Sequence, residues 1–290
     1  MKKTNAISVL CNNVDFLNII IKNLPKTFFN TTQLIVFTET RIGDKTVKLK
    51  KICDKVNGIL ITDKDVNKEF NKIVNNEFVN NWSFSLNILM HWYIFKFFDF
   101  DNVLFCDDDV IIRSEIVNLF DNKTYICAFT LNTIRDFKDE SNDTLLYKLA
   151  DCFNYEIDID KWKKYYALGA FIIYNKNNFN VKRYEKGLKK FFSSKYFIDV
   201  WKSCRSYRSK NLDERFMTMF ILKSKIENND LTKYISHINS KFEKITDKFL
   251  EKQFKDTKYI IHIGNNKGKL MTYNKCIDLG LFKGKKFKIA

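Results

Sequence analysis

Three consecutive carboxylates, Asp107, Asp108 and Asp109, are the residues whose types and spacing point most directly to chemistry. They follow the apolar run 103–106 without a linker and precede the aliphatic run 110–112. Carboxylates held side by side at the end of a buried strand repel one another and lose solvation, and a cation removes that cost. We therefore expect a cation here, and we expect Asp107→Asn or Asp109→Asn to leave the apo fold at least as stable. The alternative is a solvated aspartate-rich turn.

A divalent metal ion is the cation that suits these residues. Manganese and magnesium ions prefer oxygen ligands and would also neutralise a diphosphate group. Asp107 and Asp109 are the natural pair of metal ligands. The Asp108 side chain points the opposite way, so it would contact a hydroxyl group of the bound molecule or support the residues that hold the metal ion. Ligands of open α/β sheets collect outside the carboxyl ends of the strands, so the position of the cluster also favours a binding site.

The elements that must position this cluster form an open α/β sheet, because short β-rich runs alternate with longer helical patterns in the first half of the chain. The strand before the cluster is apolar throughout, as expected for a central strand covered on both faces. A helix over 83–98 precedes it, with apolar residues at the three-and-four spacing of one buried face. The predicted strands are 6–11, 34–38, 58–62, 103–106, 125–130, 170–174 and 259–263, and a second helix covers 213–224.

Composition indicates one large α/β domain over 1–290, because 290 residues with 45% apolar content can bury a sizeable core. Four of the eight glycines lie from Gly264 onward, which predicts a loop-rich basic C-terminal stretch from about that residue. Seven scattered cysteines without a C-x-x-C pair argue against a zinc cluster or a disulfide framework and predict reduced, mostly buried thiols. We find no signal peptide and no run of roughly twenty apolar residues, so we expect a cytoplasmic protein without an integral membrane segment.

The net charge of +16, from 50 basic and 34 acidic residues, suits an anionic partner such as nucleic acid, a membrane surface or a nucleotide sugar. The lysines are spread along the whole chain, which favours a solvated lysine-rich surface over a nucleic-acid groove. Residues 283–288 form the one local basic cluster, and its plain interpretation is a disordered tail.

The segment 100–112 resembles the strand and Asp-x-Asp motif of the GT-A glycosyltransferases, most closely the family-eight retaining enzymes of the glycogenin and lipopolysaccharide galactosyltransferase type. The resemblance implies a GT-A type nucleotide-diphospho-sugar transferase fold, with a mixed, mostly parallel central sheet flanked by helices. It also implies that a Mn²⁺- or Mg²⁺-dependent enzyme transfers a hexose from a nucleotide sugar, UDP-linked, to a hydroxyl of a glycan, glycolipid or protein acceptor, with retention.

One segment before the Asp-x-Asp motif and one after it extend this resemblance to the residues that would contact the nucleotide sugar. Residues 7–13 are similar to the family's opening strand and nucleotide-contacting loop, which implies that Asn12 and Asn13 lie near the base and ribose. Residues 165–175 are similar to the segment that meets the donor sugar, where only Gly169 is retained. Asp108 would contact the donor as well.

Two C-terminal segments complete the resemblance. Asp213 and Glu214 resemble the start of the acidic stretch beside the reacting carbon, which implies a catalytic role. Residues 262–269 are similar to the motif whose histidine completes the metal site and whose lysine grips the diphosphate. His262 is thereby implied as the third metal ligand beside the two aspartates, and Gly264 and Lys267 as donor contacts, with one residue fewer between histidine and glycine than the family has.

Three other functions are compatible with parts of the sequence. The Asp-Asp-Asp-Val run also resembles inverting β-1,3-galactosyl and fringe-type transferases, in which Asp213 or Glu214 would be the general base. A phosphatase of the haloacid-dehalogenase type also places Asp-x-Asp after an apolar strand, but normally near the start of the chain. A basic nucleic-acid-binding protein would fit the charge, although no zinc-finger, basic-zipper or RNA-recognition signature supports it.

Overall fold

The computed structural model describes residues 3–40, 44–74, 83–120, 127–128, 144–164, 171–197, 212–225, 235–238, 244–264 and 268–288. The chain divides into two compact units. Unit 1 comprises Met1–Leu60, Cys106–Lys123 and Leu231–Ala290, and unit 2 comprises Ile61–Phe105 and Thr124–Asp230. The single domain predicted over 1–290 stays a prediction.

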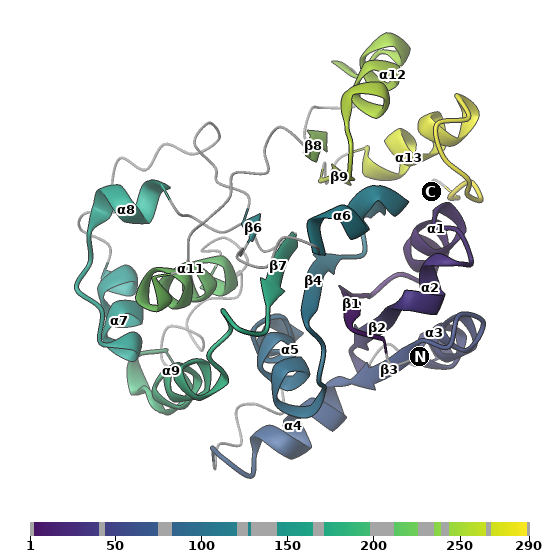
Figure 1. The fold of residues 1–290 in the computed structure, drawn as a ribbon. Coiled ribbons are helices and arrows are strands. Elements are labelled where there is room, and N and C mark those ends of the chain that lie inside the picture. The colour runs from purple at the N-terminus through teal and green to yellow at the C-terminus, as the bar shows by residue number, and fades with distance from the viewer. Residues whose placement is uncertain are drawn as a thin grey trace. The chain divides into compact units, whose positions relative to one another are not determined.

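The strands form a six-stranded sheet in the order β3-β2-β1-β4-β7-β6 and a three-stranded sheet in the order β5-β9-β8 (Figure 1). β1 runs parallel to β2, and β6 runs antiparallel to β7. The larger sheet is built from β1 (Asn5–Leu10), β2 (Thr32–Thr38), β3 (Ile59–Thr62), β4 (Asn102–Asp107), β6 (Cys127–Ala128) and β7 (Phe171–Asn175). The predicted α/β class, with a mixed, mostly parallel sheet flanked by helices, is confirmed.

The predicted strands agree closely with the structure, and their described ends differ by one or two residues. Of the strand predicted over 125–130, only Cys127–Ala128 belong to the described residues. Burial explains the agreement, because the interiors of β1, β2 and β4 are almost completely buried. Continuous apolar runs of this kind are the pattern of strands that are covered on both faces.

Unit 1 places helices beside β1 and β2 and around the three-stranded sheet (Figure 1). That sheet joins β5 (Val110–Ile112) to β9 (Ile260–Ile263) in antiparallel pairing and β9 to β8 (Ile235–Ile238) in parallel pairing. The helical elements of the unit are α1 (Val14–Asn23), α2 (Phe28–Thr31), α3 (Asp44–Asp54), η3 (Ser114–Ile116), α6 (Val117–Phe120), α12 (Asp247–Asp256) and α13 (Lys269–Asp278). Helix α1 begins at a polar cap, because the Asn13 side chain accepts a hydrogen bond from the Asp15 N–H.

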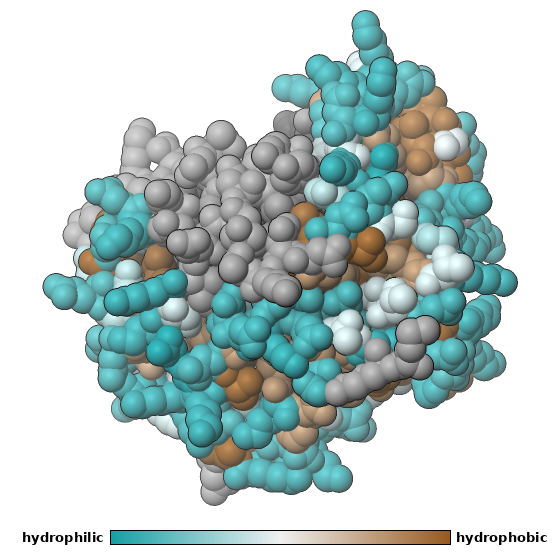
Figure 2. Space-filling model, viewed as in Figure 1, coloured by the Kyte–Doolittle hydropathy of each residue, from teal (hydrophilic) through white to brown (hydrophobic). Residues whose placement is uncertain are grey.

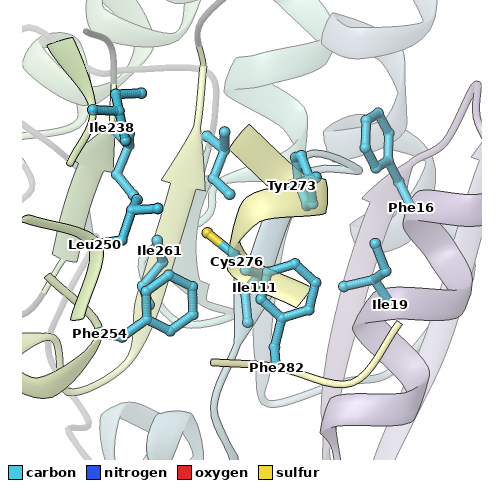
Figure 3. Packing of buried hydrophobic residues seen from close by; sticks show 12 residues of the cluster. Phe16, Ile19, Ile111, Ile238, Leu250, Phe254, Ile261, Tyr273, Cys276 and Phe282 are labelled. Atoms are coloured by element: carbon cyan, nitrogen blue, oxygen red, sulfur yellow. The ribbon is translucent and has the colours of Figure 1, made fainter. Parts of the chain in front are cut away.

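A buried cluster, here called the C-terminal core, joins the small sheet to α1, α12 and α13 (Figure 3). It contains Phe16, Ile19, Ile111, Ile238, Ile245, Leu250, Phe254, Ile261, Ile263, Tyr273, Cys276 and Phe282. Side chains of this size each contribute about 1.5–3 kcal/mol when they are fully buried. The core therefore fixes the positions of β5, which directly follows the carboxylate cluster, and of β9, which contains His262.

The C-terminal stretch contains one helix and a segment that asparagine side chains hold in place. Helix α13 covers ten residues of the stretch that the glycines predicted to be loop-rich, because its apolar residues recur at helical spacing and enter the C-terminal core. The following segment is held by two asparagines, each of which both donates to and accepts from one backbone residue: Asn23 pairs with Lys283, and Asn274 pairs with Phe287. These bonds tie Lys283 to α1 and Phe287 to α13, which argues against the interpretation of 283–288 as a disordered tail.

Unit 2 contains, besides β6, β7 and most of β4, a group of helices with an aromatic interior, in which α7, α9 and α11 lie together and α5 packs against α9 and α11 (Figure 1). Its helices are α4 (Asp63–Phe70), α5 (Ser83–Phe97), α7 (Thr144–Phe153), α8 (Ile159–Lys164), α9 (Val181–Ser193) and α11 (Leu212–Ser224). The helices predicted over 83–98 and 213–224 are confirmed as α5 and α11, but the single buried face predicted for α5 is wrong, because Ile88 and Trp92 are buried as well and Phe97 is 44% exposed. Rings from three helices meet at Phe153, Tyr184 and Phe216.

The polarity of the surface and the burial of the cysteines agree with what the composition predicts. On the face shown in Figure 2, the described residues are mainly hydrophilic, and hydrophobic residues appear in smaller groups. The predicted buried thiols are confirmed for Cys11, Cys53, Cys106, Cys152 and Cys276, while the side chains of the other two cysteines lie outside the described residues. Among the helices that are described, none is both long and apolar enough to cross a membrane.

Gly187 of α9 gives a test of this packing. Glycine within a helix normally costs stability relative to alanine. Here an added Cβ would lie 2.6 Å from Cζ of Phe153, so the ring would have to shift. We expect Gly187→Ala to lower the free energy of unfolding by about 1–3 kcal/mol, the usual cost of overpacking. Urea denaturation measures this, with the exposed helical position Lys186→Ala as the control. A Gly187→Ala protein as stable as wild type would contradict the described contact between α7 and α9.

Candidate functional site

The carboxylate cluster lies where predicted, at the carboxyl end of a buried strand. Asp107 is the last residue of β4, and β5 begins at Val110, so Asp108 and Asp109 form the turn between them. Antiparallel pairing places Val110 opposite His262 of β9, and the Ile263 N–H donates to the Asp109 carbonyl at 3.2 Å. The pairing of two short strands therefore brings the predicted histidine to the predicted aspartate, across 153 residues of sequence (109 to 262).

Asp109 is held between an imidazole and an ammonium group. Its Oδ1 lies 3.1 Å from Nε2 of His262, and its Oδ2 forms an ion pair with Nζ of Lys269. The side chain of Asp109 is only 13% exposed, so this contact is screened little by water. Lys269 follows Gly268, whose φ of 87° suits glycine, and its Nζ also lies 5.1 Å from the ring centroid of Phe16.

These neighbours fix the protonation state of Asp109. Burial alone would raise the pKa of this carboxyl group, but His262 and Lys269 outweigh burial and hold that pKa well below its ordinary value. Asp109 is therefore a carboxylate at neutral pH, stabilised by a cation that the chain supplies itself. The expectation that Asp109→Asn would leave the apo fold unharmed is reversed, because the substitution removes an attractive contact as well as a repulsive one.

Asp108 links the cluster to the loop between β1 and α1. Its Oδ2 accepts hydrogen bonds from the backbone N–H groups of Asn12 and Asn13, each at 2.9 Å. Burial raises the pKa of Asp108 to about 6 and the charge of Asp109 adds to the effect, while the two N–H groups oppose it. The loop predicted to contact a nucleotide and the Asp motif are thus in direct contact, with Asp108 positioning the loop. A donor contact of Asp108 itself stays a prediction.

The predicted metal ligands are brought together in part. Two ligands at right angles on an octahedral ion with bonds of about 2.1 Å are about 3.0 Å apart, and the Asp109–His262 separation of 3.1 Å matches this. This separation is also an ordinary hydrogen-bond distance, so it is compatible with two ligands of one cation without identifying them as such. Within the described parts of the chain, however, no three His, Cys, Asp or Glu side chains lie close enough together to hold a metal ion, so Asp107 does not complete the set here.

Lys269 is the site residue that the sequence did not reveal. Counting from the family motif selected Lys267, which lies outside the described residues, as does Gly169. The available signal was the Gly-Lys pair at 268–269, since a glycine that begins a helix can turn the next side chain toward the preceding strand end. Gly264 is described, and its N–H donates to the Ile238 carbonyl at 3.2 Å, which ties the end of β9 to β8.

Asp213 and Glu214 lie in the first turn of α11 in unit 2, as predicted. The Asp213 carboxylate accepts a hydrogen bond from Nδ2 of Asn87 in α5, and the Thr218 hydroxyl donates to the Glu214 carbonyl at 2.7 Å. Both acidic side chains are half-buried. The amide of Asn87 therefore orients Asp213, while the catalytic role of the two acids stays a prediction.

No protein-family model matches the sequence, and no curated protein matches it. The chain is similar in structure to LgtC, a galactosyltransferase solved with donor and acceptor sugar analogs, at 14% identity over 97% of both chains with a TM-score of 0.49. It is also similar to the apo glycosyltransferase GlyE of Streptococcus pneumoniae TIGR4, at 12% identity over 99% of this chain and 66% of that chain with a TM-score of 0.48. Mouse xyloside xylosyltransferase 1 gives 9% identity, 91% and 99% coverage and a TM-score of 0.46.

The two adjacent carboxylates should respond oppositely to substitution. A depressed folded pKa contributes stability above the ordinary carboxyl pKa, and this contribution is lost as the pH falls through the folded value. We expect Asp109→Asn to lose about 2 kcal/mol at pH 7, the scale of a hydrogen bond to a charged group, and to lose less at acid pH.

Asp108→Asn should instead gain about 1–2 kcal/mol at pH 7, because its amide oxygen still accepts both N–H groups and the cost of a buried carboxylate is removed. This gain fades as the pH falls below about 6, where wild-type Asp108 takes up its proton. Urea denaturation of both variants between pH 4 and 8 measures the two trends. Equal effects of the two substitutions would contradict the described environments.

Proposed function

We propose that this chain is a metal-dependent glycosyltransferase that transfers a hexose from a UDP-linked sugar to a hydroxyl of a glycan, glycolipid or protein acceptor, with retention of configuration. One observation carries the proposal. Three segments that are far apart in the sequence meet at the carboxyl end of β4: Asp108 contacts the Asn12 and Asn13 amides, and Asp109 contacts His262 and Lys269. The family resemblance assigns these same segments to the nucleotide, the metal ion and the diphosphate.

Donor binding would use the groups of unit 1. Asn12 and Asn13 would contact the base and ribose, and Gly264 would lie beside the diphosphate. A positive charge for the diphosphate would come from Lys269 or Lys267, assisted by the amides at the start of α13, where the N-cap residue is Gly268 and has no side chain to cap the helix. Exposed lysines elsewhere favour approach of an anionic donor.

Asp107, Asp109 and His262 would hold Mn²⁺ or Mg²⁺, which when bound neutralises charge on the diphosphate. The lysine side chain contributes separately, because its ammonium group stabilises the negative charge that develops on the departing diphosphate. Gly169 would lie near the donor sugar.

Retention would assign Asp213 and Glu214 a positioning role. In a same-face transfer, the departing phosphate oxygen takes the proton of the acceptor hydroxyl, so no strong protein nucleophile is required. An inverting transfer would need one of these carboxylates as a general base. The resemblance of residues 262–269 to the retaining family supports the same-face transfer, which retains the configuration.

The phosphatase alternative is disfavoured by electrostatics. In that chemistry the second aspartate of Asp-x-Asp must carry a proton to donate to a leaving group. Asp109 has a depressed pKa and an ammonium partner, so it holds no such proton at neutral pH. No described feature favours the nucleic-acid alternative.

Calorimetric titration of UDP with and without Mn²⁺ tests donor binding. We expect Asp107→Asn and Asp109→Asn to remove the Mn²⁺-dependent part of the affinity, and Lys267→Ala to weaken UDP by about 1.5–3 kcal/mol if it supplies a charged hydrogen bond. The matched control is Asp278→Asn, because Asp278 is an exposed aspartate of the same unit that pairs with Lys286. Absence of UDP binding by the wild-type protein would overturn the proposed function.

The anomeric configuration of the product distinguishes the two chemical courses. With retention, Asp213→Asn and Glu214→Gln should leave measurable turnover, because the amides keep an acceptor oxygen. With inversion, the loss of a general base should reduce the rate by about 10²-fold or more. NMR of the product made from an α-linked donor decides between them, and a β-linked product would make one of these two acids the base.

A further inference from the structure

The Asp109 carboxylate has a positive partner that belongs to the chain itself. Lys269 Nζ pairs with Oδ2, and the lysine side chain is only 21% exposed, with its ammonium near the face of the Phe16 ring. His262 lies against the other carboxylate oxygen. The two oxygens of Asp109 therefore face different groups, one compatible with a shared metal ion and one occupied by an ammonium group.

A divalent cation at Asp109 would have to share this carboxylate with Lys269. Like charges a few ångströms apart in a partly buried site repel strongly, and the carboxylate charge is already compensated. The lysine is nevertheless easy to redirect, because its ammonium ends a flexible four-carbon stem. Its backbone begins α13 directly after Gly268, and the N-terminus of a helix favours an anion.

We propose that Lys269 is a built-in counterion that weakens divalent-cation binding at Asp109 until a nucleoside diphosphate is present. The diphosphate accepts the ammonium group, which frees Oδ2 of Asp109 for the cation. Cation and nucleotide then bind cooperatively, and each must strengthen the other by the same factor. The second half of this inference rests on the proposed function, whereas the first half concerns the cation alone.

Mn²⁺ affinity, followed by the electron paramagnetic resonance signal of the free ion, tests the counterion directly. We expect Lys269→Met and Lys269→Gln to bind Mn²⁺ alone about tenfold more tightly than wild type, within the usual range of coupling between sites. Glutamine can still donate to Asp109, so a shared effect identifies charge as the cause. Lys269→Arg, which keeps the charge, and the exposed Lys285→Met should bind Mn²⁺ as wild type does.

Addition of UDP tests the cooperative half. UDP should tighten Mn²⁺ binding to wild type by about tenfold, and by clearly less in Lys269→Met. Unchanged Mn²⁺ affinity in both neutral variants would overturn the counterion role. If those variants bind Mn²⁺ more tightly but no protein binds UDP, the proposed function fails and the counterion role stands. If UDP binds and increases the Mn²⁺ affinity of wild type and of Lys269→Met by the same factor, Lys269 does not move from the carboxylate to the diphosphate, and that part of the proposal is wrong.

Discussion

The buried carboxylate of Asp109 must be neutralised, and much of unit 1 serves that constraint. Pairing of β5 with β9 places His262 on one side of the group, and the left-handed Gly268 begins α13 so that Lys269 reaches the other. The C-terminal core holds α13 and the small sheet together (Figure 3). Without that packing, both partners would be free to leave Asp109, and the carboxylate would be left desolvated and uncompensated.

Alternation along the chain lets two neighbouring carboxylates share one turn. Asp108 points toward the backbone amides of Asn12 and Asn13, whereas Asp109 points toward two basic side chains. Amide dipoles compensate a charge less than an ammonium group does, which explains why the pKa of Asp108 is raised while that of Asp109 is lowered. A cluster that the sequence presents as three equal charges is thus divided by its surroundings into chemically different groups.

Strands and motifs of this chain were predictable because they depend on local pattern. The apolar run before Asp107 needs no partner to be recognised as a buried strand, and α5 shows its apolar spacing in sequence. Lys269 was not predictable, since its role depends on where α13 begins, and α13 itself is stabilised by distant residues such as Phe16. The hydrogen bonds to Lys283 and Phe287 were not predictable for the same reason: the two asparagines that make them lie outside the basic cluster, one of them 260 residues earlier.

Coupling between Asp109 and Lys269 is the most direct test of this electrostatic arrangement. A double-mutant cycle of Asp109→Asn, Lys269→Met and the double variant, followed by urea denaturation at pH 7, isolates their interaction free energy. We predict a favourable coupling of about 1–3 kcal/mol, as residues sharing one buried ion pair show. Independent, additive effects of the two substitutions would contradict it, because Asp109 would then owe its charge to something other than Lys269.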